Sequence, residues 1–202
     1  IIANINNVSC FNDTTGNIKI ILSGGSGNYT YDWDNDGVGD FDDLDTIFNL
    51  TDGDYSVSTI DDNGCTIDST FTITEPPQII ISSTIVDNIC FNDSLGEINP
   101  IISGGTGTLV FDWSTSNGFT NNNDTITALH SDTFNLSIID DNLCSIDTFF
   151  VVSSPNELFA NITLIDANCG LLDGSASANP FGGTVAGSYL FDWDNDGTGD
   201  ND

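Results

Sequence analysis

The sequence predicts an all-β protein, built as tandem Ig-like β-sandwich repeats of about 80 residues each. Three observations support this prediction. Short phrases recur at a period near 80 residues, each copy alternates β-rich runs with Gly, Asn, Asp and Pro turns, and no stretch keeps a helical periodicity. A period of this length exceeds that of most solenoid repeats and suits a small β-sandwich.

The period is set by cysteine and tryptophan positions. Cys10 opens the phrase Cys-Phe-Asn-Asp, which returns at Cys90, and Cys169 opens a diverged third copy. Asp-Trp pairs end at Trp33, Trp113 and Trp193, which are 80 residues apart. The glycine pairs are Gly24-Gly25, Gly104-Gly105 and Gly182-Gly183. Prolines separate the copies, so we expect complete repeats at 1–78 and 79–157 and a truncated third repeat at 158–202.

The sequence of repeat one predicts six strands. We expect strands near residues 2–8, 17–22, 28–34, 45–49, 54–60 and 66–74. Alternation in the third strand turns Tyr29, Tyr31 and Trp33 inward, and the equivalent residues of the other repeats are expected to do the same.

Two turns are also predicted in repeat one. The run that leads to Tyr55 resembles a tyrosine corner, and its counterpart in repeat two has Phe134, which can only pack. Asn63-Gly64 predicts a hairpin that joins the last two strands.

Charge and composition exclude several classes of function. With 31 acidic residues and a single Lys, the net charge is −30, so the chain cannot neutralise nucleic-acid phosphates or bind an anionic membrane surface. No apolar run reaches the roughly 18 residues of a membrane span, so we expect no membrane insertion. His130 is the single histidine, and no serine stands in a nucleophile elbow. We therefore expect no enzyme and no catalytic residues.

The strongest chemical motif is the aspartate-rich segment 32–43. With Asp32 as position 1, carboxylates fall at positions 3, 5, 9 and 12 and a glycine at position 6, which is the spacing of an EF-hand-type calcium loop. The candidate ligands are Asp32, Asp34, Asp36, Asp40 and Asp43, with the backbone carbonyl of Val38. The third repeat offers Asp192, Asp194, Asp196, Thr198 and Asp200. We expect structural Ca²⁺ at both; in so acidic a chain, chance spacing is the alternative.

Repeat two lacks this motif. Ser114 and Ser116 replace the second and third ligands after Asp112, so we expect the loop of repeat two to bind no metal.

The order of these motifs resembles the SprB repeat family. The residues that carry the resemblance are Cys10, Gly16, Gly24-Gly25, Tyr29 to Trp33, Leu50 to Val57, Asp61 to Cys65 and Phe71 to Pro76. The resemblance implies a very large cell-surface adhesin of gliding Bacteroidota that is exported by the type 9 secretion system. The expected location is therefore extracellular, at the bacterial cell surface, as part of a longer secreted polypeptide.

The cysteines are expected to be structural. Each complete repeat holds two, and in a secreted sandwich this predicts one disulfide per repeat, Cys10–Cys65 and Cys90–Cys144, with the partner of Cys169 beyond the chain. Free buried thiols are the alternative, and zinc is disfavoured because no Cys-x-x-Cys pair is present.

The expected function is that of stalk repeats in a surface adhesin or filament used in attachment or gliding, stiffened by disulfides and calcium. The expected partners are neighbouring repeats, and surface polysaccharide or other surface proteins. Two alternatives remain open: a carbohydrate- or surface-binding module, and an accessory region of a secreted enzyme.

Overall fold

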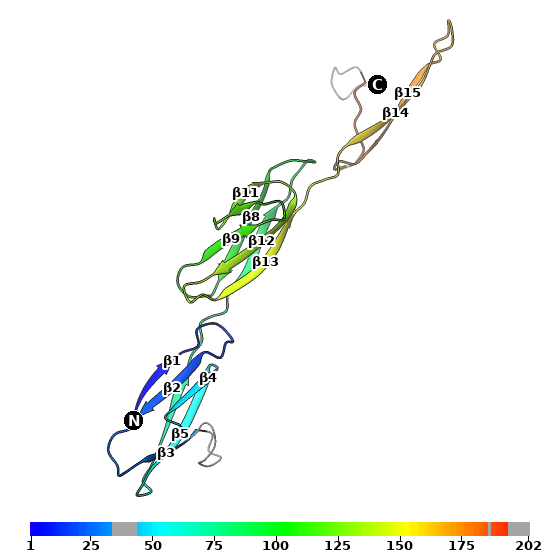
Figure 1. The fold of residues 1–202 in the computed structure, drawn as a ribbon. Coiled ribbons are helices and arrows are strands. Elements are labelled where there is room, and N and C mark those ends of the chain that lie inside the picture. The colour runs from blue at the N-terminus through cyan, green and yellow to red at the C-terminus, as the bar shows by residue number, and fades with distance from the viewer. Residues whose placement is uncertain (34–43, 186, 194–202) are drawn as a thin grey trace. The chain divides into compact units, whose positions relative to one another are not determined.

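The computed structural model describes residues 1–33, 44–185 and 187–193. These residues form fifteen strands and no helix, which confirms the all-β class (Figure 1). No helix capable of crossing a membrane occurs in this part of the chain.

Two compact units make up the chain. The first is Ile1–Ser82 with Ile102–Phe111 and Ser137–Asp147, and the second is Ser83–Ile101, Asp112–Leu136 and Thr148–Asp202. The first unit thus includes two segments of the expected second repeat, and the boundaries at 78 and 157 stay a prediction.

Repeat one folds as two three-stranded antiparallel sheets. One sheet has the order β1-β2-β4 and the other β3-β5-β6. This division of strands is that of an Ig-like sandwich, in which strands A, B and E face strands C, F and G. The strands are β1 (Ile2–Asn6), β2 (Gly16–Ile21), β3 (Tyr29–Asp32), β4 (Thr46–Leu50), β5 (Gly53–Asp61) and β6 (Thr66–Ile73). All six expected strands form, within two residues of the predicted bounds.

The core of this sandwich draws on both sheets. Ile18 and Ile20 alternate along β2 and are almost fully buried, and Val57 and Ile73 close the core from the other sheet. Trp33 is buried in the same cluster, while Tyr31 packs against its edge. The inward alternation predicted for this strand is thus confirmed at its tryptophan.

Repeat two forms a three-stranded sheet, β11-β8-β7, and a four-stranded sheet, β10-β9-β12-β13. The strands are β7 (Ile80–Val86), β8 (Gly96–Ser103), β9 (Val110–Ser114), β10 (Thr120–Asn121), β11 (Ile126–Leu129), β12 (Asp132–Ile139) and β13 (Ser145–Val152). Trp113 and Ile98 are fully buried. The short strand β10, which the sequence did not predict, pairs with β9 at the place where repeat one has its aspartate-rich segment.

Repeat three is described as one hairpin of β14 (Phe159–Ile165) and β15 (Ser175–Phe181), paired over seven residues. Trp193 is 47% exposed, so the inward position expected for it is not found. The described residues of this repeat supply no second sheet against which the indole could be buried.

Candidate functional site

The predicted calcium ligands fall mostly outside the described residues. Asp34, Asp36, Val38, Asp40, Asp43, Asp194, Asp196, Thr198 and Asp200 all lie there. Asp32, the first ligand of its loop, lies at the end of β3 opposite Ser58, and Asp192 is exposed. Within the described ranges, no three His, Cys, Asp or Glu side chains gather closely enough to hold a metal. The calcium sites therefore stay predictions.

The two ends of the aspartate-rich segment are nevertheless fixed. The indole Nε1 of Trp33 donates a hydrogen bond to the carbonyl oxygen of Leu44 at 2.9 Å, which joins the residues on either side of positions 34–43. Trp113 makes the same bond to the carbonyl of Asn123, also at 2.9 Å. The tryptophan therefore has a second role beside core packing: its indole bonds a backbone carbonyl ten or eleven residues further along the chain. The sequence contained the residue but gave no sign of this bond.

The tyrosine corner is present in repeat one. The Tyr55 hydroxyl donates to the carbonyl oxygen of Thr51 at 3.1 Å, in the backbone just ahead of β5. Phe134 takes this position in repeat two and is buried, so there the contact is packing alone, as expected.

The glycine pairs hold the chain that enters a repeat. The amide of Gly105 donates to the carbonyl oxygen of Pro77 at 2.9 Å. At Gly104, with φ of +82°, a Cβ atom would lie 1.8 Å from the carbonyl oxygen of Gln78, so only glycine allows the linker to pass so close. Ile79, the residue that follows, is buried.

The same arrangement recurs at the third repeat. Gly183 donates to the carbonyl of Asn156 at 2.9 Å, and a Cβ on Gly182 would lie 1.9 Å from the carbonyl oxygen of Glu157. The sequence predicted the glycine pair but not its role. We call each pair the seat of the linker, the linker being residues 77–79 before repeat two and 156–158 before repeat three.

Beside the glycine pair of repeat two lies a tight turn that ends in a cysteine. In repeat two, the buried carboxylate of Asp140 accepts hydrogen bonds from the amides of Cys144, Asn142 and Thr106, each at 2.9 Å. The turn lies between β12 and β13, so these bonds fix the position of Cys144.

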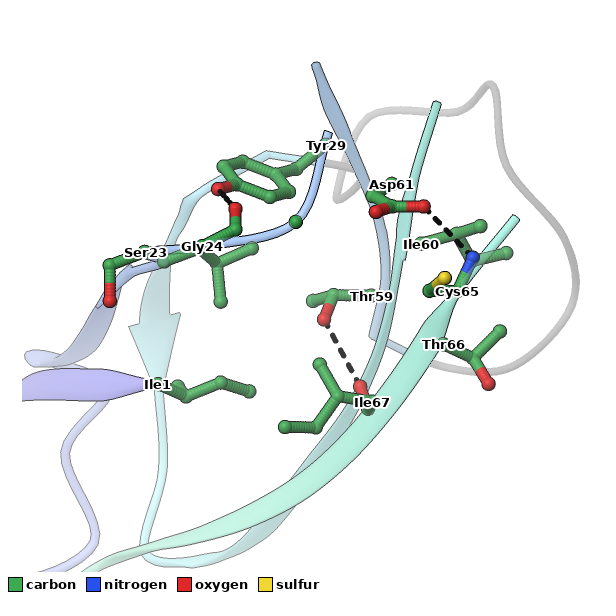
Figure 2. Close-up of a pocket in the computed structure, with 12 residues that line it drawn as sticks. Ile1, Ser23, Gly24, Tyr29, Thr59, Ile60, Asp61, Cys65, Thr66 and Ile67 are labelled. Carbon is green, nitrogen blue, oxygen red and sulfur yellow. Dashed lines mark hydrogen bonds between the residues drawn. The ribbon is translucent and has the colours of Figure 1, made fainter. Parts of the chain in front are cut away.

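Repeat one has an equivalent turn. The Asp61 carboxylate accepts a hydrogen bond from the amide of Cys65 at 2.9 Å (Figure 2). It also accepts from the amide of Asn63 at 2.9 Å and from that of Ser26 at 3.0 Å. The backbone hydrogen bond from Cys65, with further ones from Ser26 and Asn63, lowers the pKa of Asp61 below its usual value. The predicted Asn63-Gly64 hairpin is confirmed, but residues 62–65 separate the strands, rather than the two residues expected.

The disulfide differs from the expected pairing. Cys10 is bonded to Cys144, with 5.6 Å between their Cα atoms, and this bond lies within the first compact unit. Cys65, Cys90 and Cys169 are free and exposed. The side-chain amide of Asn142 donates to the carbonyl of Ser9 at 3.0 Å beside the bond. The expected bonds Cys10–Cys65 and Cys90–Cys144 are therefore not formed.

Strand β6 explains why the expected bond is impossible. Cys65 directly precedes this strand of eight residues. Cys10 lies beyond the other end, where the neighbouring Asn12 amide bonds the Glu75 carboxylate at 2.6 Å. Eight residues at about 3.3 Å each separate the two cysteines by roughly 26 Å. A disulfide needs Cα atoms within about 7 Å.

Comparisons with known proteins agree with the sequence motifs. Residues 2–38 match the model of the SprB repeat family. No curated protein is significantly similar in sequence. The amphioxus IgVJ-C2 molecule is 15% identical, with 75% of this chain and 96% of that chain covered and a TM-score of 0.32.

A fragment of intimin, solved with the intimin-binding domain of the translocated intimin receptor, is also similar in structure. It is 14% identical, with 78% of this chain and 67% of that chain covered and a TM-score of 0.37. The matched residues 2–38 include the first cysteine, the glycine pair and the Tyr-x-Tyr-x-Trp strand, and over them the chain is similar to the SprB repeat family.

Proposed function

We propose that this chain is part of the stalk of a large secreted bacterial surface adhesin or filament, in which the repeats supply reach and continuity rather than catalysis. The observation that supports the proposal is the seat of the linker. The Pro77–Gly105 hydrogen bond, the close passage of Gln78 over Gly104 and the Cys10–Cys144 bond all tie the exit of one repeat to the entry of the next. Such ties suit a spacer that must transmit position along its length.

The net charge of −30 is consistent with this role. Strong like charge on every repeat keeps neighbouring stalks apart and soluble. The SprB repeat match supports a location at the cell surface or in the secreted fraction. The role in attachment or gliding is a further step of the proposal, which this match does not itself indicate.

Structural calcium belongs to the same proposal. Asp34, Asp36 and Asp40 would supply hard oxygen ligands between two ends that Trp33 and Leu44 hold together. A site of extracellular affinity, on the order of 10⁻⁴ to 10⁻³ M, would fill after export and favour the folded state there.

The test is an attachment assay on cells that produce the full protein with altered repeat number. We expect attachment to follow stalk length: deletion of one 80-residue period changes it, and an unrelated sandwich of equal length inserted in its place restores it. Antibodies against this chain should label intact cells.

Two results would contradict the stalk. Saturable binding of the purified chain to polysaccharide or to cell surfaces would make it a binding module. The same conclusion would follow if attachment were lost on deletion of these repeats and restored by the repeats themselves but not by a spacer of equal length. A catalytic domain elsewhere in the full protein, with activity that depends on these repeats, would favour an accessory region of an enzyme.

A further inference from the structure

The four cysteines of the two complete repeats fall into two structural classes. The loop cysteines, Cys10 and Cys90, follow the first strand of their repeats, and the turn cysteines, Cys65 and Cys144, precede the last strand. The one disulfide in the described residues joins a loop cysteine of repeat one to the turn cysteine of repeat two. The other member of each class is free and exposed.

The two turn cysteines have the same backbone setting. Asp61 and Cys65 are joined by an amide-to-carbonyl bond of 3.1 Å, and Asp140 and Cys144 by one of 3.0 Å. The next residue of each turn bonds the segment after the glycine pair, Asp62 to Ser26 at 3.0 Å and Asp141 to Thr106 at 3.1 Å. Cys65 is therefore held in the geometry in which Cys144 forms its bond.

The loop cysteines also match. The carbonyl of Cys10 accepts from the amide of Asp13 at 3.2 Å, and that of Cys90 accepts from Asp93 at 3.3 Å. The residue two positions after each cysteine is an asparagine with positive φ, 58° at Asn12 and 56° at Asn92. The loop that presents Cys10 to its partner is thus repeated at Cys90.

A hollow of about 160 Å³ lies beside Cys65 (Figure 2). It is lined by Ile1, Gly24, Gly25, Tyr29, Asp61 and Cys65, among others. In repeat two the linker runs across the corresponding place: Pro77 bonds Gly105, Gln78 crosses Gly104 and Ile79 is buried. At Gly24, by contrast, no heavy atom lies within 4 Å of where a Cβ would be, although its φ of +90° is like that of Gly104.

We propose that this hollow is the docking site for the linker and loop cysteine of a preceding repeat of the same kind, so that each loop cysteine bonds the turn cysteine of the next repeat. Cys65 then bonds the loop cysteine of the preceding repeat, and Cys90 bonds the turn cysteine of the repeat that follows. The loop cysteine of the third repeat is Cys169, and the 54-residue spacing of Cys90 and Cys144 then places the turn cysteine of that repeat, the partner of Cys90, near position 223. The result is a covalent ladder along the stalk.

Each bond of the ladder forms by thiol–disulfide exchange with an oxidising disulfide, either a dithiol–disulfide oxidoreductase or a small-molecule disulfide. The thiolate of one cysteine attacks the oxidant and forms a mixed disulfide. The second cysteine, as thiolate, then displaces the oxidant from that mixed disulfide. Two thiols are oxidised to one disulfide, and the two protons that they lose are taken up by the two leaving thiolates of the oxidant, which is thereby reduced to two thiols.

The ladder rests on the proposed stalk, because it requires further repeats, and a disulfide map tests it. The full protein is taken from the cell surface, alkylated without reduction and cleaved before aspartates. This cleavage places the five cysteines in five peptides, residues 1–12, 62–67, 87–92, 141–146 and 166–172, with the first extended upstream in a longer chain.

We expect peptide 1–12 linked to 141–146, and peptides 62–67 and 87–92 each linked to a cysteine peptide of another repeat. A bond between the Cys10 and Cys65 peptides, or between the Cys90 and Cys144 peptides, would overturn the ladder. So would alkylated free thiols at Cys65 and Cys90 in the full protein. Either result leaves the dependence of attachment on repeat number unaffected, so the two proposals fail separately.

Paired glycine variants test the docking site apart from the cysteines. In the 202-residue chain, Gly104→Ala should lower the melting temperature by several degrees more than Gly24→Ala, because both carry the cost of positive φ but only Gly104 meets a linker. In a chain that includes the preceding repeat, the two shifts should become equal. A Gly24→Ala shift that stays small there would overturn the docking site.

Discussion

Replacing either cysteine of the Cys10–Cys144 pair should destabilise the chain, whereas Cys65→Ser should not. Cys10 and Cys144 close a span of 134 residues, and Cys65 is a free and exposed thiol of nearly the same sequence context as Cys144. Serine keeps the size of the side chain, so the comparison isolates the covalent link. Cys65→Ser is thus the matched control for Cys144→Ser.

The magnitude follows from loop closure. A cross-link that spans 134 residues removes chain entropy from the unfolded state worth about 5 kcal/mol. If only repeat one unfolds while the second stays folded, the restricted loop runs from Cys10 to the linker, about 70 residues, and the same relation gives about 4 kcal/mol. The expected loss of unfolding free energy therefore lies between these two values.

The assay is urea unfolding of four proteins, the parent chain and its Cys10→Ser, Cys144→Ser and Cys65→Ser variants, followed by tryptophan fluorescence. Trp33 and Trp113 are both buried, so each sandwich has its own reporter. We expect Cys10→Ser and Cys144→Ser to shift the midpoint of the Trp33 transition equally, and added reductant to shift the parent by the same amount. Cys65→Ser should coincide with the parent.

One result would refute the reasoning. If Cys65→Ser lost as much stability as Cys10→Ser while Cys144→Ser behaved like the parent, the bond would lie within repeat one. The roughly 26 Å separation along β6 would then be wrong for the protein in solution.

Three further predictions concern single groups. Tyr55→Phe should cost about 1 kcal/mol of unfolding free energy, since it removes the hydroxyl's bond to the Thr51 carbonyl and leaves the ring; a variant as stable as the parent in denaturant titration would show that the corner is packing alone. Asp61 has a lowered pKa, so its carboxylate stabilises the fold above the usual aspartate pKa, near pH 4, and this contribution is lost as the pH falls through the lowered value. The unfolding free energies of the parent and of Asp61→Asn should therefore converge at low pH. A constant difference between them at all pH values would contradict this. Calcium at about 100 times its dissociation constant should add about 2.7 kcal/mol, or roughly 10 °C or more in melting temperature, and Asp34→Asn should abolish the gain; a melting temperature unmoved by chelator would remove calcium from the proposal.

Local features of repeat one followed directly from the sequence. Alternation and turn residues placed its six strands, and a Leu-x-x-Gly-x-Tyr run placed the Tyr55 corner, because both depend on residues close together in the chain. The strand β10 was missed because a pair of strand residues, Thr120 and Asn121, has no periodicity to detect.

The cysteine pairing was wrong for a different reason. Two thiols at a constant spacing in each repeat fit a bond within a repeat and a bond between successive repeats equally well, since both conserve the period. Only the length of β6, which carries Cys65 away from Cys10, separates the two cases. The predicted burial of Trp193 was also wrong, because it depends on a second sheet that the described part of repeat three does not supply.

The Cys10–Cys144 bond also determines what happens when the chain is pulled from its ends. Tension that enters before Cys10 crosses the sulfurs to Cys144, so the residues between them bear no load through the backbone. Those 134 residues represent roughly 450 Å of extended chain that unfolding under force cannot release. Only reduction of the disulfide, and not a larger force on the folded domains, would release that length. The extensibility of this segment therefore depends on whether the disulfide is oxidised or reduced.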